Sequence, residues 1–208
     1  MRGNTTRTEG EALARVLGAG RAVWWLTPAA MLSAVVQGTL AVRHSVAEWR
    51  GGAAEAWGPW VLTASWSDLA DAADAVVVIG LAFVWSVWAA RLAALARRRG
   101  DLDGPSPVSV GLVQFFFPLT LHYPFLQLRR LARALGAADA VRPALLMYAA
   151  SAVFLLASPL YATDRLVAWL VADGVWIAAT LAGNALALVV LARVQRGARE
   201  GSVADVFA

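Results

Sequence analysis

The chain has 208 residues, of which 60% are hydrophobic and only 15% are charged, and its formal net charge is +4. Ordinary soluble domains are about 45–50% apolar and about 25% charged, so this composition excludes an ordinary water-soluble globule and favours a membrane protein. The chain has no cysteine, which excludes disulfides, thiolate metal sites and cysteine nucleophiles.

The first apolar run covers residues 22–42 and follows a polar segment, residues 1–21. Its 21 residues carry no formal charge, and at about 1.5 Å per residue they can cross a hydrocarbon core of about 30 Å. The run is longer than the apolar part of a cleavable signal peptide and has no small-residue cleavage site after it. We therefore expect a retained first transmembrane helix, preceded by a cytoplasmic N-terminal segment.

A connecting segment, residues 43–70, contains four tryptophans and is expected at the outer interface, because an indole ring is apolar while its N–H prefers water. The second helix is predicted at residues 68–97, after a possible N-cap at Ser67. The helix dipole favours acids in the first turns, which here hold Asp68, Asp71 and Asp74. Their D-x-x-D spacing also occurs at magnesium sites. On a helix, however, each carboxylate is rotated away from the one three residues before it, so the three do not converge on one ion. We therefore interpret these acids as residues that stabilise the start of the helix.

The run from residue 104 to residue 128 is also uncharged and contains Pro107, Pro118 and Pro124. A spanning run would give five helices and nine arginines on each side of the membrane. A run that enters and returns gives four helices, with 15 arginines inside and three outside, namely Arg43, Arg50 and Arg165. Arginine in short loops stays on the cytoplasmic side, and proline breaks a helix where the chain must turn back. We therefore predict a cytoplasmic-side re-entrant or interfacial hairpin.

The third helix is predicted at residues 143–163, because proline suits its first turn. Asp164 and Arg165 leave only a tight outer turn, so the fourth helix, residues 166–194, should pack antiparallel to it. Residues 198–208 are expected to form a cytoplasmic tail. The sequence thus predicts an all-α polytopic protein of the cell membrane, with four transmembrane helices and the hairpin in a single transmembrane domain, residues 22–197, and both termini inside.

Three stretches resemble domain-of-unknown-function family 4328, whose members are polytopic membrane proteins of actinobacteria. They are Trp88-Ala-Ala-Arg91, the run Phe115-Phe116-Phe117-Pro118 with Tyr123-Pro124, and the last helix from Val171 to Gln195. The resemblance covers about residues 65–197. Leu95 stands where the family pattern has asparagine, so the chain resembles a divergent member of the family. The resemblance implies a membrane topology and no activity.

Polar residues form two stripes within the apolar helices, since residues at about 100° per position return to one helix face. The stripe on the fourth helix consists of Asp173, Thr180 and Asn184, and the stripe on the first helix of Ser33, Gln37 and His44. A carboxylate facing lipid is costly, so both stripes should face the bundle interior, either as polar contacts between helices or as a path for protons. Small residues beside the fourth-helix stripe predict a close helix contact: Gly174, Ala178 and Ala182.

Arginines flank the predicted hairpin on the cytoplasmic side, with Arg142 beside them. Those expected to bind anionic lipid or a partner are Arg91, Arg97, Arg98, Arg99, Arg129, Arg130 and Arg133. Each basic residue near an anionic membrane surface contributes about 1 kcal/mol, and orientation alone needs fewer arginines. All 18 basic residues are arginine, and they lie at the ends of apolar runs and not on one soluble face, so a nucleic-acid partner is not expected.

No catalytic constellation appears in the sequence. The two histidines, His44 and His122, are predicted at different depths, more than about 15 Å apart in a core of about 30 Å, so they cannot share a haem iron. No catalytic residue, metal or cofactor is therefore expected. The leading hypothesis is a non-enzymatic membrane module whose basic hairpin contacts anionic lipid, a membrane subunit or a second copy. The alternatives are a small transporter or channel using the Asp173 and Asn184 stripe, and a membrane-embedded enzyme acting on a lipid-soluble substrate.

Overall fold

The structure is a computed structural model that describes residues 2–49, 64–100, 105–115, 122–163 and 165–207. The long helices of this part are α1 (Arg2–Trp49), α2 (Ala64–Arg98), α5 (Val141–Ala157) and α6 (Leu166–Phe207). Two shorter helices, α3 (Pro107–Phe115) and α4 (His122–Ala134), lie between α2 and α5 in the chain. The 3₁₀ turns η3 (Ala138–Ala140) and η4 (Ser158–Ala162) precede and follow α5, and no strand occurs among the described residues.

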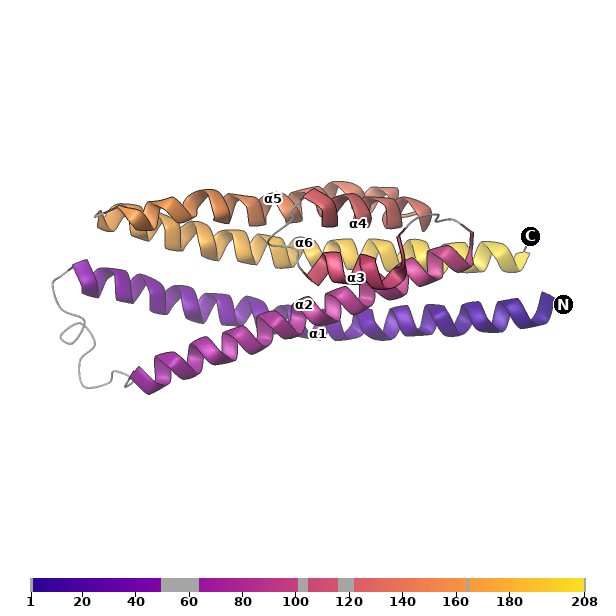
Figure 1. The fold of residues 1–208 in the computed structure, drawn as a ribbon, viewed down its shortest axis with the longest axis horizontal. Helices are drawn as coiled ribbons and strands as arrows, with labels where there is room; N and C mark the ends of the chain where they lie inside the picture. The colour runs from indigo at the N-terminus through magenta and orange to yellow at the C-terminus, as the bar shows by residue number, and fades with distance from the viewer. Residues whose placement is uncertain (1, 50–63, 101–104, 116–121, 164, 208) are drawn as a thin grey trace.

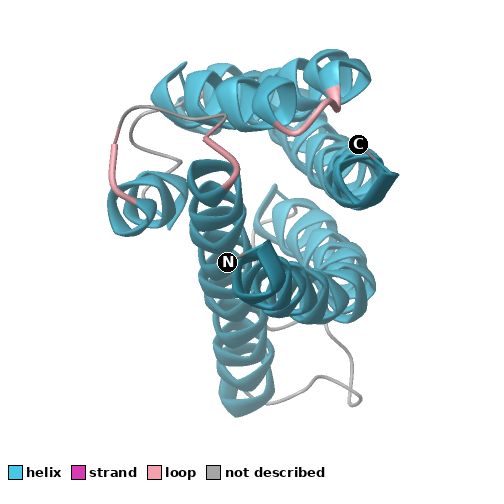
Figure 2. Cartoon of the chain, turned by 90° about the vertical axis from the view of Figure 1, so that its right-hand side faces the viewer, coloured by secondary structure: helices cyan, strands magenta, loops and turns pink. Residues whose placement is uncertain are grey.

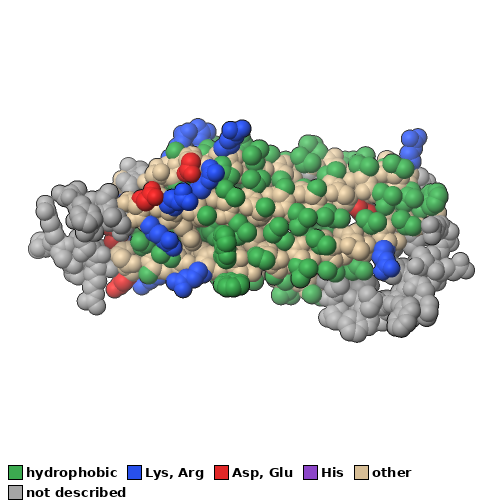
Figure 3. All heavy atoms as spheres, turned by 180° about the vertical axis from the view of Figure 1, so that it is seen from behind, with side chains coloured by type: hydrophobic (Ala, Val, Ile, Leu, Met, Phe, Trp, Pro, Cys, Tyr) green, Lys and Arg blue, Asp and Glu red, His purple; other side chains and the backbone are tan. Residues whose placement is uncertain are grey.

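The prediction of an all-α chain with four long apolar helices is confirmed. Four helical segments of the described chain are long and apolar enough to cross a membrane: Thr8–Arg43, Asp71–Arg98, Ala138–Leu160 and Leu166–Gly201. Large apolar side chains are exposed along these segments, among them Leu32, Val76, Phe83 and Leu156. Figure 3 shows a green and tan middle on one face of the molecule, with most of the blue arginines of that face gathered toward one end.

The helices α1, α2 and α6 are longer than predicted, whereas α5 ends at Ala157 and is followed by the 3₁₀ turn η4. The helix α1 continues through most of residues 1–21, and α6 continues through the expected tail to Phe207. Alanine, leucine, arginine and glutamate are strong helix formers. The helices α1 and α6 can therefore continue into the charged segments that flank their apolar runs. Hydropathy therefore located the apolar part of each helix but not its ends. Residues 50–63 of the predicted connecting segment lie outside the described residues.

The helix α1 packs against both α2 and α6, and α5 packs antiparallel on α6 (Figure 1). Both termini lie at one end of the bundle, called here the terminal end, and α2 runs obliquely to α1 (Figures 1 and 2). The helix α3 packs on α2 and α4 on α5, and the two short helices contact each other. They therefore join the α1 and α2 side of the bundle to the α5 side.

The buried core lies in the half of the bundle nearer the terminal end, where the short helices add to the long ones. The apolar residues buried there include Val16, Val23, Trp88, Leu92, Leu95, Leu128, Leu131, Val190, Leu191 and Val194. The helix α3 approaches α2 closely at Gly111, where an added Cβ would lie only 3.0 Å from the carbonyl oxygen of Ser86. Glycine at this position therefore permits α3 to pack directly on the α2 backbone.

Candidate functional site

The helix α4 has one buried face and one arginine-bearing face. Leu128, Leu131 and Ala132 are spaced one helical turn apart and are almost fully buried. Pro124 lies in the first turn, where its missing N–H breaks no helical hydrogen bond. The helix ends at Ala134 and is followed by Gly136, whose φ of 71° suits glycine, while Ala137 N–H donates to Ala132 O at 2.7 Å. This closed end orients the helix so that its arginines lie on the opposite face.

The α4 arginines are Arg129, which is half-buried, and Arg130 and Arg133, which are exposed. No described residue forms a hydrogen bond or ion pair with any of the three guanidinium groups. They form one basic surface, called here the α4 arginine face. Sequence analysis predicted these three residues as part of a set of seven arginines that bind anionic lipid or a partner, and α4 carries these three.

Other predicted arginines contact the protein itself. Arg99 forms an ion pair with Glu9 of α1 at 2.7 Å and donates to the carbonyl oxygen of Ala198 in α6 at 2.9 Å. Arg91 and Arg98 donate to carbonyl oxygens of α1, those of Arg15 and Thr8, both at 3.0 Å. Arg91, Arg98 and Arg99 thus join α2 to α1 and α6 at the terminal end. Arg97 is exposed and has a partner within the chain.

The side chain of Gln114 in α3 joins α2, α4 and α5, which sequence analysis did not predict. Its oxygen accepts hydrogen bonds from Trp85 Nε1 at 3.2 Å and from the Tyr148 hydroxyl at 2.7 Å. Its Nε2 donates to the carbonyl oxygen of Pro124 at 2.9 Å. All of these residues are buried. An amide within the apolar run Val113-Gln114-Phe115 was the available signal, because polar groups among apolar helices usually find partners.

The fourth-helix acid Asp173 is buried and contacts α1, in agreement with the predicted interior position. The hydroxyl of Ser45 donates to Asp173 Oδ2 at 3.0 Å, and Ser45 is itself only 8% exposed. Asp173 has a further interaction within the chain. The contact lies one residue beyond His44, whose side chain is outside the described residues.

The first-helix residue Ser33 contacts α2 and not α6. Its hydroxyl donates to Asp74 Oδ1 at 2.5 Å. Asp74 was expected in the first turns of the second helix, but α2 begins at Ala64, so Asp74 lies almost three turns inside it. The earlier helix start thus places this carboxylate where it can bond to α1. The side chain of Asp68 lies outside the described residues, and Asp71 is exposed.

The remaining described stripe residues form no hydrogen bond between helices. Asn184 Nδ2 donates to the carbonyl oxygen of Thr180 one turn earlier in α6, at 2.9 Å, and Gln37 is half-buried. The predicted small-residue seam was wrong, because Gly174, Ala178 and Ala182 are all exposed. Close approach of α1 and α6 instead uses Gly38, where an added Cβ would overlap the side chain of Ile177.

The described residues contain no group of three or more histidine, aspartate or glutamate side chains that could hold a metal ion. His122 is exposed at the start of α4. Comparison of the chain with protein-family models, curated proteins and solved structures finds no match. The resemblance to family 4328 therefore stays a prediction, and the reasoning about function rests on the residues themselves.

Proposed function

We propose that this chain is a multi-pass protein of the cell membrane and acts as a non-enzymatic module that binds anionic lipid headgroups through the α4 arginine face. The observation that carries the proposal is the arrangement of α4. Its apolar face is buried in the bundle, while Arg129, Arg130 and Arg133 have no partner among the described residues. Arginine can bind phosphate oxygens through two parallel hydrogen bonds, which makes such a face suited to phospholipid.

The proposed orientation places the terminal end in the cytoplasm. Fifteen of the 18 arginines then lie inside, as the preference of arginine for cytoplasmic loops requires. The helices α3 and α4 form the proposed hairpin: α3 leads away from the terminal end and α4 leads back toward it (Figure 1). In this orientation Arg129, Arg130 and Arg133 lie on the side that faces anionic cytoplasmic lipid.

The transporter alternative requires polar groups that follow one another through the membrane along one route. Away from the arginine contacts near the terminal end, three interhelical polar contacts of the described residues lie at separate places. Ser45 meets Asp173 between α1 and α6, Ser33 meets Asp74 between α1 and α2, and Gln114 lies among α2, α4 and α5. This distribution favours contacts that hold helices together over a path for ions or protons.

The test measures the lipids that purify with the protein. Wild-type protein extracted in mild detergent should be enriched in anionic phospholipid relative to the bulk membrane. Replacing Arg129, Arg130 and Arg133 with glutamine should remove most of that enrichment, because each arginine near an anionic surface contributes about 1 kcal/mol. The matched control replaces Arg15, Arg196 and Arg199 with glutamine, which removes the same charge from three exposed arginines elsewhere.

Equal loss of anionic lipid from both triple variants would show that net charge alone is responsible and would contradict a role specific to α4. Purified protein in liposomes should show no proton or cation flux above that of empty vesicles. A flux that Asp173→Asn abolishes would make the transporter the leading function.

A further inference from the structure

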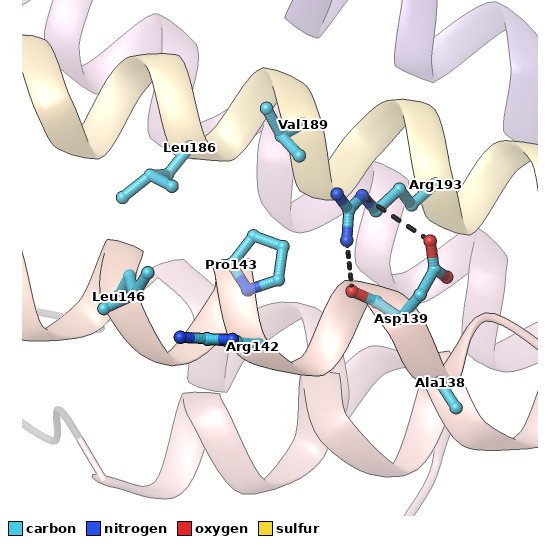
Figure 4. Close-up of a pocket in the computed structure, with 8 residues that line it drawn as sticks. All are labelled: Ala138, Asp139, Arg142, Pro143, Leu146, Leu186, Val189 and Arg193. Carbon is cyan, nitrogen blue, oxygen red and sulfur yellow. Dashed lines mark hydrogen bonds and ion pairs between the residues drawn. The ribbon is translucent and has the colours of Figure 1, made fainter.

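A groove lies between α5 and α6 and is lined by η3 as well, and none of the α4 arginines lines it. It has a volume of about 490 Å³, which is within the range of small-molecule sites. Figure 4 shows Arg142 and Pro143 of α5 along one side and Val189 of α6 along the other. We propose that this groove binds one anionic phospholipid, with the phosphate at Arg142 and the start of an acyl chain against the leucines.

The groove has a charged end and an apolar end. Arg193 and Asp139 line the end nearer the chain termini, whereas Leu146 and Leu186 line the end toward the middle of the helices (Figure 4). Seven residues separate Leu186 from Arg193, which corresponds to about 10 Å along a helix. A phospholipid that enters from the cytoplasmic leaflet has the same order, with its phosphate at the headgroup level and its acyl chains toward the bilayer centre.

Two arginines line the groove, and one of them is available to bind a phosphate. Arg193 is held in place by Asp139, since it donates to the Asp139 carbonyl oxygen at 2.6 Å and lies 3.5 Å from its carboxylate. That carboxylate offsets most of the charge of Arg193. Arg142 is exposed, and no described residue accepts a hydrogen bond from it. Arg142 is thus the free cation at the groove within the described part of the chain, and its planar guanidinium matches a phosphate.

The apolar side chains explain why the proposed occupant is a lipid and not a soluble anion. Leu146 is 50% exposed and Val189 is 38% exposed. Both lie within helical segments that are long and apolar enough to cross a membrane. A soluble phosphate would leave these side chains uncovered, whereas an acyl chain would cover them. This inference rests on the proposed membrane placement but not on the α4 arginines, so the two sites can be tested separately.

The experiment uses the full-length protein, purified and delipidated in mild detergent and then incubated with phosphatidylglycerol or phosphatidylcholine. Native mass spectrometry counts the lipids that remain bound. Wild-type protein should keep one phosphatidylglycerol per chain, and Arg142→Gln should weaken its binding on the order of tenfold, the effect of losing one charge-assisted hydrogen bond. Leu146→Trp, which fills the groove but keeps Arg142, should also displace the lipid. The matched control Arg130→Gln removes an exposed arginine of α4 and should leave this single lipid bound.

Unchanged occupancy in both groove variants would overturn the proposal, even if the α4 triple variant loses its broader enrichment of anionic lipid. Equal retention of phosphatidylcholine would show that the phosphate charge is not recognised at Arg142 and would also overturn it. Inorganic phosphate is the third ligand tested, after the two phospholipids. If it raises the melting temperature as much as phosphatidylglycerol does, the groove binds a soluble anion and the lipid assignment is wrong.

Discussion

The buried amide of Gln114 offers the sharpest test of the bundle. Gln114→Leu introduces an apolar side chain of similar size and removes three hydrogen bonds, to Trp85, Tyr148 and the Pro124 carbonyl group. We expect the substitution to loosen the contact of α3 with α2, α4 and α5, because the buried Trp85 N–H, the Tyr148 hydroxyl and the Pro124 carbonyl group each lose a hydrogen bond.

The expected loss of stability follows from the number of hydrogen bonds removed. Hydrogen bonds between helices in a membrane contribute about 0.6 kcal/mol on average and about 1.7 kcal/mol at most, so three give a loss of about 2–5 kcal/mol. Tyr148→Phe removes the bond of 2.7 Å to the Gln114 oxygen, and loss of that bond should cost about 0.6–1.7 kcal/mol. The double variant should lose less than the sum of the single losses, since both substitutions remove that bond.

Unfolding in mixed micelles of increasing denaturing detergent, followed by tryptophan fluorescence, measures these losses. Gln127→Leu is a matched control, because Gln127 is a buried amide of α4 that has no hydrogen bond to a described residue. It should cost clearly less than Gln114→Leu. A Gln114→Leu variant as stable as the wild type, or strict additivity with Tyr148→Phe, would refute the reasoning.

Two further predictions concern the fourth-helix acid and the topology. Asp173→Asn keeps an acceptor for the Ser45 hydroxyl and should retain most of the thermal stability, whereas Asp173→Leu leaves that buried hydroxyl without this bond and should lose about 1–2 kcal/mol more. Equal melting temperatures for the two variants would contradict this role. The chain has no cysteine of its own, so a membrane-impermeant maleimide should label Thr163→Cys in intact cells but Ala138→Cys only after permeabilisation. The reverse pattern would overturn the proposed orientation.

The four long helices could be predicted because each contains an apolar run, and run length is a local property of the sequence. Prolines in residues 104–128 likewise predicted that this segment is not one long helix, and the described parts of it contribute α3 and α4. The basic face of α4 was also predictable, since Leu128 and Leu131 alternate with Arg129 and Arg130 at helical spacing.

The partners of the polar side chains could not be predicted, because they come from distant parts of the chain. The three hydrogen-bond partners of Gln114 are separated from it in the sequence by 29, 10 and 34 positions. The prediction for Asp74 depended on where the second helix begins, and that helix begins at Ala64, four residues before the predicted start. The small-residue seam failed for a related reason: spacing shows which residues share a face but not which face meets a neighbour.

In the proposed membrane placement, the positions of the two carboxylates that accept a serine hydrogen bond follow from what holds helices together in lipid. Between apolar helices in a bilayer the hydrophobic effect contributes little, so packing and interhelical hydrogen bonds must hold the bundle. The half nearer the chain termini has the larger packed core, to which α3 and α4 contribute. Nearer the other end, Ser33 bonds to Asp74 of α2 and Ser45 bonds to Asp173 of α6, so α1 is joined to both neighbours. Acids within apolar helices thus have a structural explanation that requires no path for protons between α1 and α6.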